Sequence, residues 1–173
     1  MWRTYQILLP LFSLFLTRVD LTDLFPLTYE VQLINLLDGD TAIVALGSQK
    51  LKVRFSKLDA PEKGQPFVSG SGDAGLTSLK CARKIIQNKK TFTLTIYKQD
   101  IYGRLLGDLD DLSFKLVKSG CVALYPHAEF SSQSEKWKFL RAYSESRRLK
   151  KGLWNMGGYR QPKLWRKQRR RPS

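Results

Sequence analysis

Two cations and two carboxylates lie close together in the stretch RFSKLDAPE, residues 54–62. Arg54 is followed by Asp59 five residues later and by Glu62 eight residues later, and Pro61 directly precedes the glutamate. An arginine can bind two phosphate oxygens at once, one carboxylate can hold a hard cation, and a second can orient or deprotonate water. Each residue alone is more often part of a surface ion pair. Their joint occurrence indicates the chemistry of phosphodiester hydrolysis.

Two further acidic residues, Asp38 and Asp40, flank Gly39 in the segment LLDGDTAIV. A DG pair between two strands is by itself an ordinary turn. If neighbouring strands of a barrel bring Asp40 beside Asp59, the two carboxylates, a backbone carbonyl and water make a site for Ca²⁺ or Mg²⁺. This all-oxygen set does not suit Zn²⁺, which favours nitrogen and sulfur ligands.

A second arginine, Arg104, closes the segment DIYGR, where Gly103 allows a tight turn into the next strand. Arg54 lies near the end of a strand, and the alternation there permits either face. Two arginines and a bound cation would neutralise the charge that develops on a phosphate during hydrolysis. The elements that carry these residues must therefore meet in space.

The composition indicates a polyanionic partner. The chain has 173 residues, with 30 Lys and Arg against 15 Asp and Glu, and a net charge of +15. Nucleic acid and an anionic membrane both suit such a charge, but four Trp and seven Tyr residues favour nucleic acid, because bases stack on aromatic rings. The last fourteen residues carry seven cations and no acid. They predict either a nonspecific grip on a polyanion or a solvated tail.

The N-terminus contains about ten apolar residues, 7–16, between two arginines. This length suits the core of a signal peptide and is shorter than the ~20 residues that span a bilayer. We expect a secretory signal or an uncleaved anchor, which would make the protein exported (secreted or periplasmic) or membrane-anchored. A packed N-terminal extension is the alternative.

The two cysteines, Cys81 and Cys121, leave two alternatives open, one disulfide or two buried thiols. A metal site on them is not expected, because His127 is the single histidine of the chain.

Alternation of apolar and polar residues predicts strands at residues 29–37, 41–46, 50–58, 90–97 and 104–110. The first three are joined by tight turns and form an antiparallel meander. Helices are predicted at residues 74–87, 113–120 and 133–152. Ser71 or Asp73 is expected to cap the first helix, and Gly120 to stop the second. The apolar face of the first helix consists of Leu76, Leu79, Ala82, Ile85 and Ile86.

Five short strands, with one helix inserted after the third, predict an α+β fold. We expect a five-stranded OB-fold barrel with about three helices, since this is the best match among β architectures that bind oligonucleotides. The predicted organisation is an N-terminal signal or anchor segment with a linker at 1–28, the barrel domain at 29–156 and a basic tail at 157–173.

Six short motifs occur in a fixed order: DGDT at 38–41, VRFSKLDAPE at 53–62, QP at 65–66, YGR at 102–104, LVKSG at 116–120 and GLW at 152–154. In this order the chain resembles staphylococcal (micrococcal) nuclease and its thermonuclease relatives, over about residues 30 to 156. The resemblance implies an OB-fold hydrolase, a phosphodiesterase of the endonuclease type, that cuts DNA and RNA with Ca²⁺ as cofactor and leaves 3′-phosphate ends.

The resemblance also implies a role for each site residue. The residues that match the catalytic set are Arg54, Glu62 and Arg104. Those that match the calcium ligands are Asp40, Asp59 and Ala60, the last through its backbone carbonyl. Substrate contacts are implied for Tyr102 and Tyr125, and an outer position around the ion for Asp38. The segment after Arg104 is about four residues shorter than in the staphylococcal enzyme, and Ser113 replaces a helix-starting Asn, although a hydroxyl can still cap.

These observations predict a calcium-dependent nuclease acting on single-stranded or unwound DNA and RNA, monomeric and without an obligate protein partner. A noncatalytic OB-fold that binds nucleic acid is the alternative, but such a domain would be expected to lose the two arginines or Glu62. A basic membrane-surface protein would leave Asp40, Asp59 and Glu62 without a role.

Overall fold

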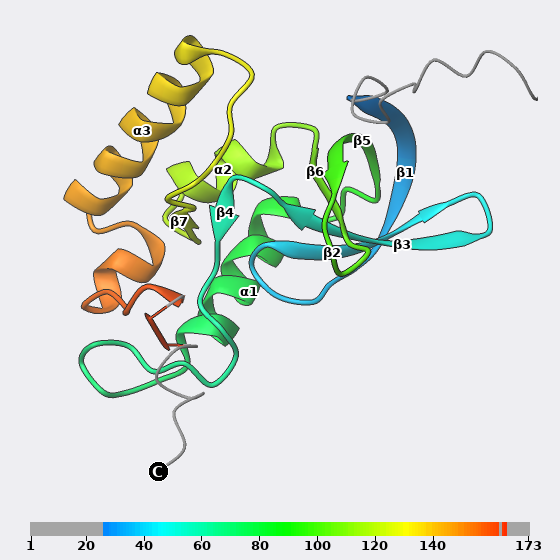
Figure 1. Ribbon diagram of the computed structural model, residues 1–173. Helices are drawn as coiled ribbons and strands as arrows, with labels where there is room; N and C mark the ends of the chain where they lie inside the picture. Colours follow the sequence, from blue (N-terminus) through cyan, green and yellow to red (C-terminus); the bar gives the residue numbers. More distant parts are fainter. Residues whose placement is uncertain (1–25, 163, 166–173) are drawn as a thin grey trace, which may run out of the picture.

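The computed structural model describes residues 26–162, 164 and 165 (Figure 1). Residues 7–16, in which we expect a signal or anchor, lie outside this part, as does most of the basic tail. Within the described part, no helix is both long enough and apolar enough to cross a membrane. The description that follows therefore concerns the predicted barrel domain.

Five strands close into a barrel in the order β1-β2-β3-β6-β5. Their bounds are Leu27–Leu36 for β1, Thr41–Leu46 for β2, Gln49–Phe55 for β3, Thr91–Gln99 for β5 and Leu105–Leu109 for β6. Strands β1, β2 and β3 pair antiparallel, as the sequence predicts. The barrel closes through a parallel pairing of β3 with β6 and antiparallel pairings of β5 with β6 and β1.

Three α-helices accompany the barrel in the described residues: α1 at Ala74–Ile86, α2 at Leu112–Lys118 and α3 at Gln133–Arg148. A 3₁₀ helix follows at Gly152–Met156. Helix α2 packs against both α1 and α3 and lies between the barrel and α3 (Figure 1). This architecture confirms the predicted five-stranded OB-fold barrel with about three helices.

The sequence misses two very short strands, β4 at Leu58–Asp59 and β7 at Ala123–Leu124, which pair with each other outside the barrel. The predicted third strand ran to residue 58 without a break, but β3 ends at Phe55 and the chain turns at Ser56. Strands of two residues carry too little alternation to be detected. The turn matters because it separates Arg54 on β3 from Asp59 on β4.

Asp73 is the N-cap of α1, and its carboxylate accepts a hydrogen bond from the Leu76 amide at 2.9 Å. The expectation that Leu76 lies on the buried face is wrong, since it is 41% exposed. The residues buried on α1 are Ala74, Gly75, Ser78, Leu79, Ala82 and Ile86. Small residues at the start of the helix allow a close approach to the loop before it, which leaves Leu76 on the outer side.

The resemblance implies that Ser113 caps the start of α2, but Ser113 is not the N-cap of this helix. The helix begins one residue earlier and its N-cap is Asp111. The buried Ser113 hydroxyl instead donates to the carboxylate of Asp108 on β6. Gly120 follows the helix with a φ of 70°, which agrees with its predicted role as a stop.

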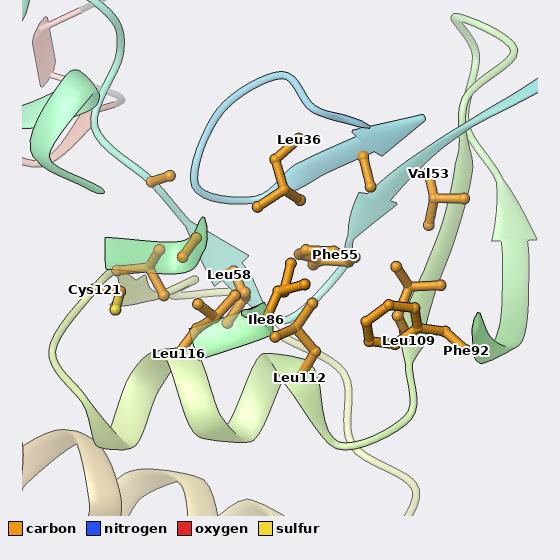
Figure 2. Packing of buried hydrophobic residues seen from close by; sticks show 14 of the residues in the cluster. Leu36, Val53, Phe55, Leu58, Ile86, Phe92, Leu109, Leu112, Leu116 and Cys121 are labelled. Carbon is orange, nitrogen blue, oxygen red and sulfur yellow. The ribbon is translucent and has the colours of Figure 1, made fainter. Parts of the chain in front are cut away.

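The core fills the barrel and the space between the barrel and the helices. Val53 and Phe55 of β3 point inward with Leu109 of β6, and Leu112 and Leu116 of α2 cover the end of the barrel (Figure 2). All five side chains are buried. Burial of such side chains stabilises the fold by about 1.5–3 kcal/mol each.

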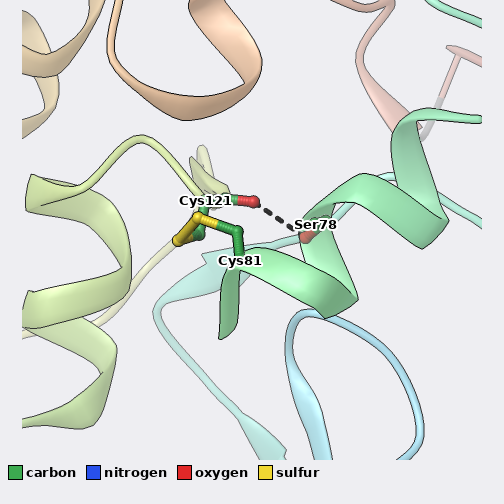
Figure 3. Close-up of a disulfide and its surroundings, with 3 residues drawn as sticks. All are labelled: Ser78, Cys81 and Cys121. Atoms are coloured by element: carbon green, nitrogen blue, oxygen red, sulfur yellow. Dashed lines mark hydrogen bonds between the residues drawn. A yellow bond between two sulfur atoms is a disulfide. The ribbon is translucent and has the colours of Figure 1, made fainter. Parts of the chain in front are cut away.

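The cysteines form a disulfide between Cys81 of α1 and Cys121, which follows α2 (Figure 3). This decides between the two alternatives that the sequence left open. The Cys121 carbonyl also accepts a hydrogen bond from the Ser78 hydroxyl at 2.7 Å. Helix α1 is thus held to the segment after α2 by one covalent bond and one buried hydrogen bond.

A buried ammonium group ties the turn after β3 to the rest of the molecule. Lys57 is 2% exposed, and its Nζ lies 2.5 Å from the carboxylate of Asp108 and 3.4 Å from that of Glu135. The Tyr97 hydroxyl is 3.3 Å away. These partners come from β6, α3 and β5, so the chain between Arg54 and Asp59 is fixed from three sides.

Candidate active site

The pairing of β2 with β3 places Asp40 beside Arg54. Thr41, the first residue of β2, lies opposite Arg54 on β3, so Asp40 ends the DGD turn at the same level. The Phe55 amide donates to the Asp40 carbonyl at 2.8 Å and holds the turn against the strand. The Asp40 amide in turn donates to Asp38 Oδ1 at 3.0 Å.

The strand geometry of β3 decides which way Arg54 points. Side chains of a strand alternate between its two faces, and both neighbours of Arg54, Val53 and Phe55, are fully buried inside the barrel. Arg54 and Lys52 therefore point outward, and both line a cleft on the barrel surface. This settles the face of Arg54, which the alternation alone left open.

The parallel pairing of β3 with β6 brings Arg104 to the same place. Leu105 lies opposite Val53, so Arg104 stands just before the paired segment. Its guanidinium is held by Asp100 through Nε at 2.7 Å and a terminal nitrogen at 2.7 Å. Burial alone would raise the pKa of Asp100, but hydrogen bonds from Arg104 and Tyr102 outweigh it and lower the pKa.

The carboxylates of Asp40 and Asp59 lie on either side of one guanidinium group. Arg54 Nη1 contacts Asp40 Oδ1, and Arg54 Nη2 lies 3.9 Å from Asp59 Oδ1 and 3.3 Å from the Leu58 carbonyl. The Ala60 amide donates to Asp40 Oδ2 at 2.6 Å. The structure therefore gathers Asp40, Asp59 and Ala60, the three predicted metal ligands, next to Arg54.

Burial makes the negative charge of Asp40 costly. The residue is 2% exposed, and this burial raises the pKa of its carboxyl to about 7. The Arg54 charge and the Ala60 amide act in the opposite direction, while Asp38 raises the pKa further. Additional positive charge at this place would stabilise the ionised form.

Glu62 is held on a loop that is fixed by its backbone. The Glu62 amide donates to Gln65 Oε1 at 3.1 Å, and the Gln65 amide donates back to the Glu62 carbonyl at 3.0 Å. Gln65 is fully buried, and its side-chain nitrogen donates to the Arg160 carbonyl at 2.6 Å. Gly75 of α1 packs so closely that a Cβ there would overlap the Glu62 carbonyl.

The predicted aromatic contacts lie at the cleft as well. Tyr102 is 78% exposed, and the Arg104 guanidinium lies over its ring with 5.6 Å between Cζ and the ring centroid. Tyr125 is half-buried and makes a T-shaped contact with His127 at 5.6 Å. Both tyrosines line the same cleft as the arginines.

One cleft of about 650 Å³ thus collects the predicted side chains, and Asp40, Asp59 and Ala60 are buried directly beside its Arg54. Its lining residues are Asp38, Thr41, Lys52, Arg54, Glu62, Tyr102, Arg104 and Tyr125. Three cations and two tyrosine rings around an opening suit a phosphate group and the base attached to it. A carboxylate within this cationic wall supplies a base for proton transfer.

The oxygen donors of Asp40, Asp59 and Ala60 fit a hard divalent cation such as Ca²⁺ or Mg²⁺. Two buried carboxylates that share one arginine have charge to spare for such an ion. In the described residues, this site included, no group of three or more His, Cys, Asp or Glu side chains is arranged to hold a metal. The chemistry of the donors argues against Zn²⁺.

Sequence reasoning missed three residues that shape the site: Lys52, Gln65 and Asp100. Lys52 shares the outward face of β3 with Arg54, two residues away, and only the direction of that face would have revealed it. Asp100 opens the turn before Arg104, and its Oδ1 accepts from the Tyr102 amide at 2.9 Å. Aspartate commonly bonds the amide two residues on, so its position in DIYGR is a usable signal.

The barrel and its cleft define an OB-fold protein with a cationic cleft whose chemistry suits a phosphate-containing ligand. A family model described as staphylococcal nuclease homologue matches residues 52–156. A protein of Escherichia coli O157:H7 named "Uncharacterized endonuclease" is 29% identical over 140 residues, 78% of this chain and 83% of that protein. The "Micrococcal nuclease" of Shigella flexneri is 26% identical over 149 residues, 79% of each chain.

A plant protein, the "Probable staphylococcal-like nuclease CAN1" of Oryza sativa subsp. japonica, is 27% identical over 127 residues. The match covers 71% of this chain but 34% of the plant protein. Since the family model matches more than half of the chain, from within β3 to beyond α3, the chain belongs to the staphylococcal nuclease family. The resemblance stated from the sequence motifs is confirmed.

Proposed function

We propose that the protein is a Ca²⁺-dependent nuclease that hydrolyses phosphodiester bonds of DNA and RNA and leaves 3′-phosphate ends. One observation carries the proposal: Arg54, Arg104 and Glu62 line one cleft, with Asp40 and Asp59 buried beside it. The names of the relatives, which include endonuclease and micrococcal nuclease, support the same activity.

The two arginines bind and orient the phosphodiester. Arg104 is pre-positioned by Asp100, so it donates to phosphate oxygens with little loss of side-chain freedom. Arg54 reaches the cleft from the adjacent strand and adds positive charge where the transition state becomes more negative. A divalent ion held by Asp40, Asp59 and the Ala60 carbonyl would supply further positive charge to a phosphate oxygen.

Glu62 acts as the base. Its carboxylate accepts a proton from water while the water oxygen bonds to phosphorus, and the bond from phosphorus to the 5′ oxygen breaks. The 5′ oxygen takes up a proton from solvent water and leaves as a hydroxyl, so the phosphate stays on the 3′ side. The backbone bonds to Gln65 hold Glu62 in place for this step.

Glu62 separates an enzyme from a binding protein. A protein that merely holds a polyanion gains nothing from a carboxylate in a cationic cleft, because its charge opposes the ligand. Glu62→Gln should therefore bind single-stranded DNA as well as the parent, or slightly better, and lose turnover on the order of 10²–10⁴-fold. The control is Glu129→Gln, since Glu129 is exposed, pairs with Lys98 and lies outside the cleft.

The experiment measures cleavage of an end-labelled oligonucleotide in Ca²⁺ or in excess EGTA, and binding in EGTA alone. Activity with Ca²⁺, loss with EGTA, and products that a 3′-phosphatase dephosphorylates are expected. Asp40→Asn should lose activity severely at every Ca²⁺ concentration. A Glu62→Gln variant that cuts as fast as the parent would refute the assigned role. A parent that binds but never cuts would establish the noncatalytic alternative.

A further inference from the structure

The outer face of α3 carries a groove of about 760 Å³ that is separate from the cleft. We name it the α3 groove, after lining residues that include Trp137, Arg141, Tyr143, Ser144, Arg147 and Arg148. No residue of this set lines the cleft described above. The helix lies on the outer side of α2, away from the barrel (Figure 1).

Helical periodicity explains why this face is open. The buried residues of α3 are Phe139, Ala142 and Ser146, spaced three and four apart on one side. Trp137 and Arg141 fall on the opposite side, where a soluble helix normally places charged residues. Trp137 is nevertheless 68% exposed. A large aromatic ring that is held in water by its own helix indicates a surface that contacts a partner.

The charge of the α3 groove indicates that its partner is negatively charged. Its described lining includes three arginines and no carboxylate. Glu145, the nearest acid on the helix, is not part of the groove and pairs with Lys151 at 3.4 Å. An anionic partner with flat apolar groups suits an exposed ring among arginines, because rings stack on bases while guanidinium groups bind phosphates.

Aromatic contacts connect the α3 groove to the cleft. The Arg147 guanidinium lies over the rings of Tyr143 and Trp154, at 5.7 and 5.4 Å. Trp154 stacks on Tyr159 at 5.3 Å, and the Tyr159 hydroxyl donates to the Asp59 carbonyl at 3.5 Å. A continuous set of packed rings thus runs from the groove to a predicted metal ligand. These contacts connect the α3 groove with the segment that carries a predicted metal ligand.

We propose that the α3 groove binds the single-stranded part of a polynucleotide substrate whose scissile phosphate lies in the cleft. Trp137 stacks on an unpaired base, and Arg141 and Arg148 bind phosphates. A duplex would hide the faces of its bases, so the groove selects single strands. The identity of the polymer rests on the proposed nuclease function, while the groove and its charge do not.

Binding of a fluorescent single-stranded 20-mer is measured by anisotropy in EGTA, so that no cleavage occurs. Trp137→Ala should weaken binding about ten-fold, within the range for loss of one base–aromatic stack. Trp137→Phe, which keeps a ring, should recover most of this loss. Because Trp137 is exposed, the variants should fold, and thermal unfolding verifies this.

The phosphate contacts are tested by salt dependence. Replacing Arg141 and Arg148 together by Gln should reduce the slope of log affinity against log salt by about 1.4, or ~0.7 for each phosphate released. The control removes two charges of the exposed face of α1, Lys80 and Lys84, and should leave the slope unchanged. Equal slopes for the two double variants would overturn the assignment, since charge alone would then explain binding.

Cleavage separates this inference from the proposed function. On a dinucleotide the Trp137→Ala variant should match the parent, whereas on the 20-mer its KM should rise about ten-fold with kcat unchanged. If the Trp137→Ala variant and the parent bind the 20-mer with equal affinity, the proposed binding at the α3 groove is refuted, even if the parent cuts. Loss of binding to anionic phospholipid vesicles, with 20-mer binding retained, would assign the face to a membrane instead. A parent protein that never cuts but depends on Trp137 for binding would refute the proposed nuclease function and support binding of single strands at the α3 groove.

Discussion

Removal of the disulfide, by replacing Cys81 and Cys121 with alanine, is expected to lower the free energy of unfolding by about 4 kcal/mol. The two residues are 40 apart in sequence. The chain-entropy relation assigns a cross-link that closes a loop of this length about 4 kcal/mol at 25 °C, because it restricts the unfolded chain. Domains of this size are stable by about 5–15 kcal/mol in total. The loss is therefore large, but the variant should still fold.

The assay is urea unfolding followed by tryptophan fluorescence. With an m-value of about 2 kcal/mol per M, the midpoint should fall by about 2 M. The parent in a phosphine reductant should approach the midpoint of the alanine variant, which separates loss of the bond from the change of side chain. If the parent has no titratable thiol in denaturant and still unfolds at the midpoint of the variant, the reasoning is refuted.

Removal of the disulfide should also affect the predicted metal site, because α1 connects the two. The Cys121 carbonyl accepts from the Ser78 hydroxyl, and Ser78 packs so tightly under Gly39 that a Cβ on this glycine would overlap its hydroxyl. Gly39 precedes Asp40. A looser α1 should therefore weaken the apparent affinity for Ca²⁺ in the cleavage assay. Unchanged calcium dependence in the variant would show that the DGD turn keeps its conformation without support from α1.

Two further predictions concern packing and pH. Gly75→Ala should displace the Glu62 loop and reduce turnover about 10²-fold, the cost of roughly 1 Å of misplacement. Lys80→Ala, on the exposed side of α1, is the control and should leave turnover unchanged. Equal kinetics for the two variants would refute a role of the contact between Gly75 and Glu62. Burial opposes the ionised form of Glu135, but hydrogen bonds from Ser131 outweigh this and lower its pKa from the usual 4.5. The stabilisation by the ionised Glu135 is fully present above pH 4.5 and is lost as pH falls through the lowered pKa. Glu135→Gln should therefore cost about 1 kcal/mol at pH 7, and this cost should shrink progressively below pH 4.5 in urea titrations. A cost that is independent of pH would contradict the assignment.

The sequence predicts the strands well because the barrel has one buried and one exposed face. In β2 the bounds agree to the residue, since Thr41 follows the DGD turn and Leu46 precedes the next one. The sequence does not predict the order in which the strands pair. The parallel contact of β3 with β6, which brings Arg104 beside Arg54, joins segments about fifty residues apart and leaves no local pattern.

Residue types also mislead where burial is unusual. Lys57 reads as an exposed lysine of a strand, yet it is buried between Asp108 and Glu135. A buried charge persists only when tertiary partners compensate it, and those partners come from distant elements. For the same reason the sequence left the pairing of the cysteines open. The motifs pointed to residues that the fold brings together at one cleft, whereas the groups that support those residues could be identified only from the fold.

Helix α1 shows how an element outside the cleft can position its chemistry. No residue of α1 lines the cleft, but Gly75 contacts the backbone of Glu62, and Ser78 lies under the turn that carries Asp40. One helix thus supports both the proposed base and a predicted metal ligand. The disulfide at Cys81 anchors that helix one turn further along. Because both contacts are to backbone or to a glycine, they constrain the shape of the site without contributing a functional group, and motif matching alone does not reveal them.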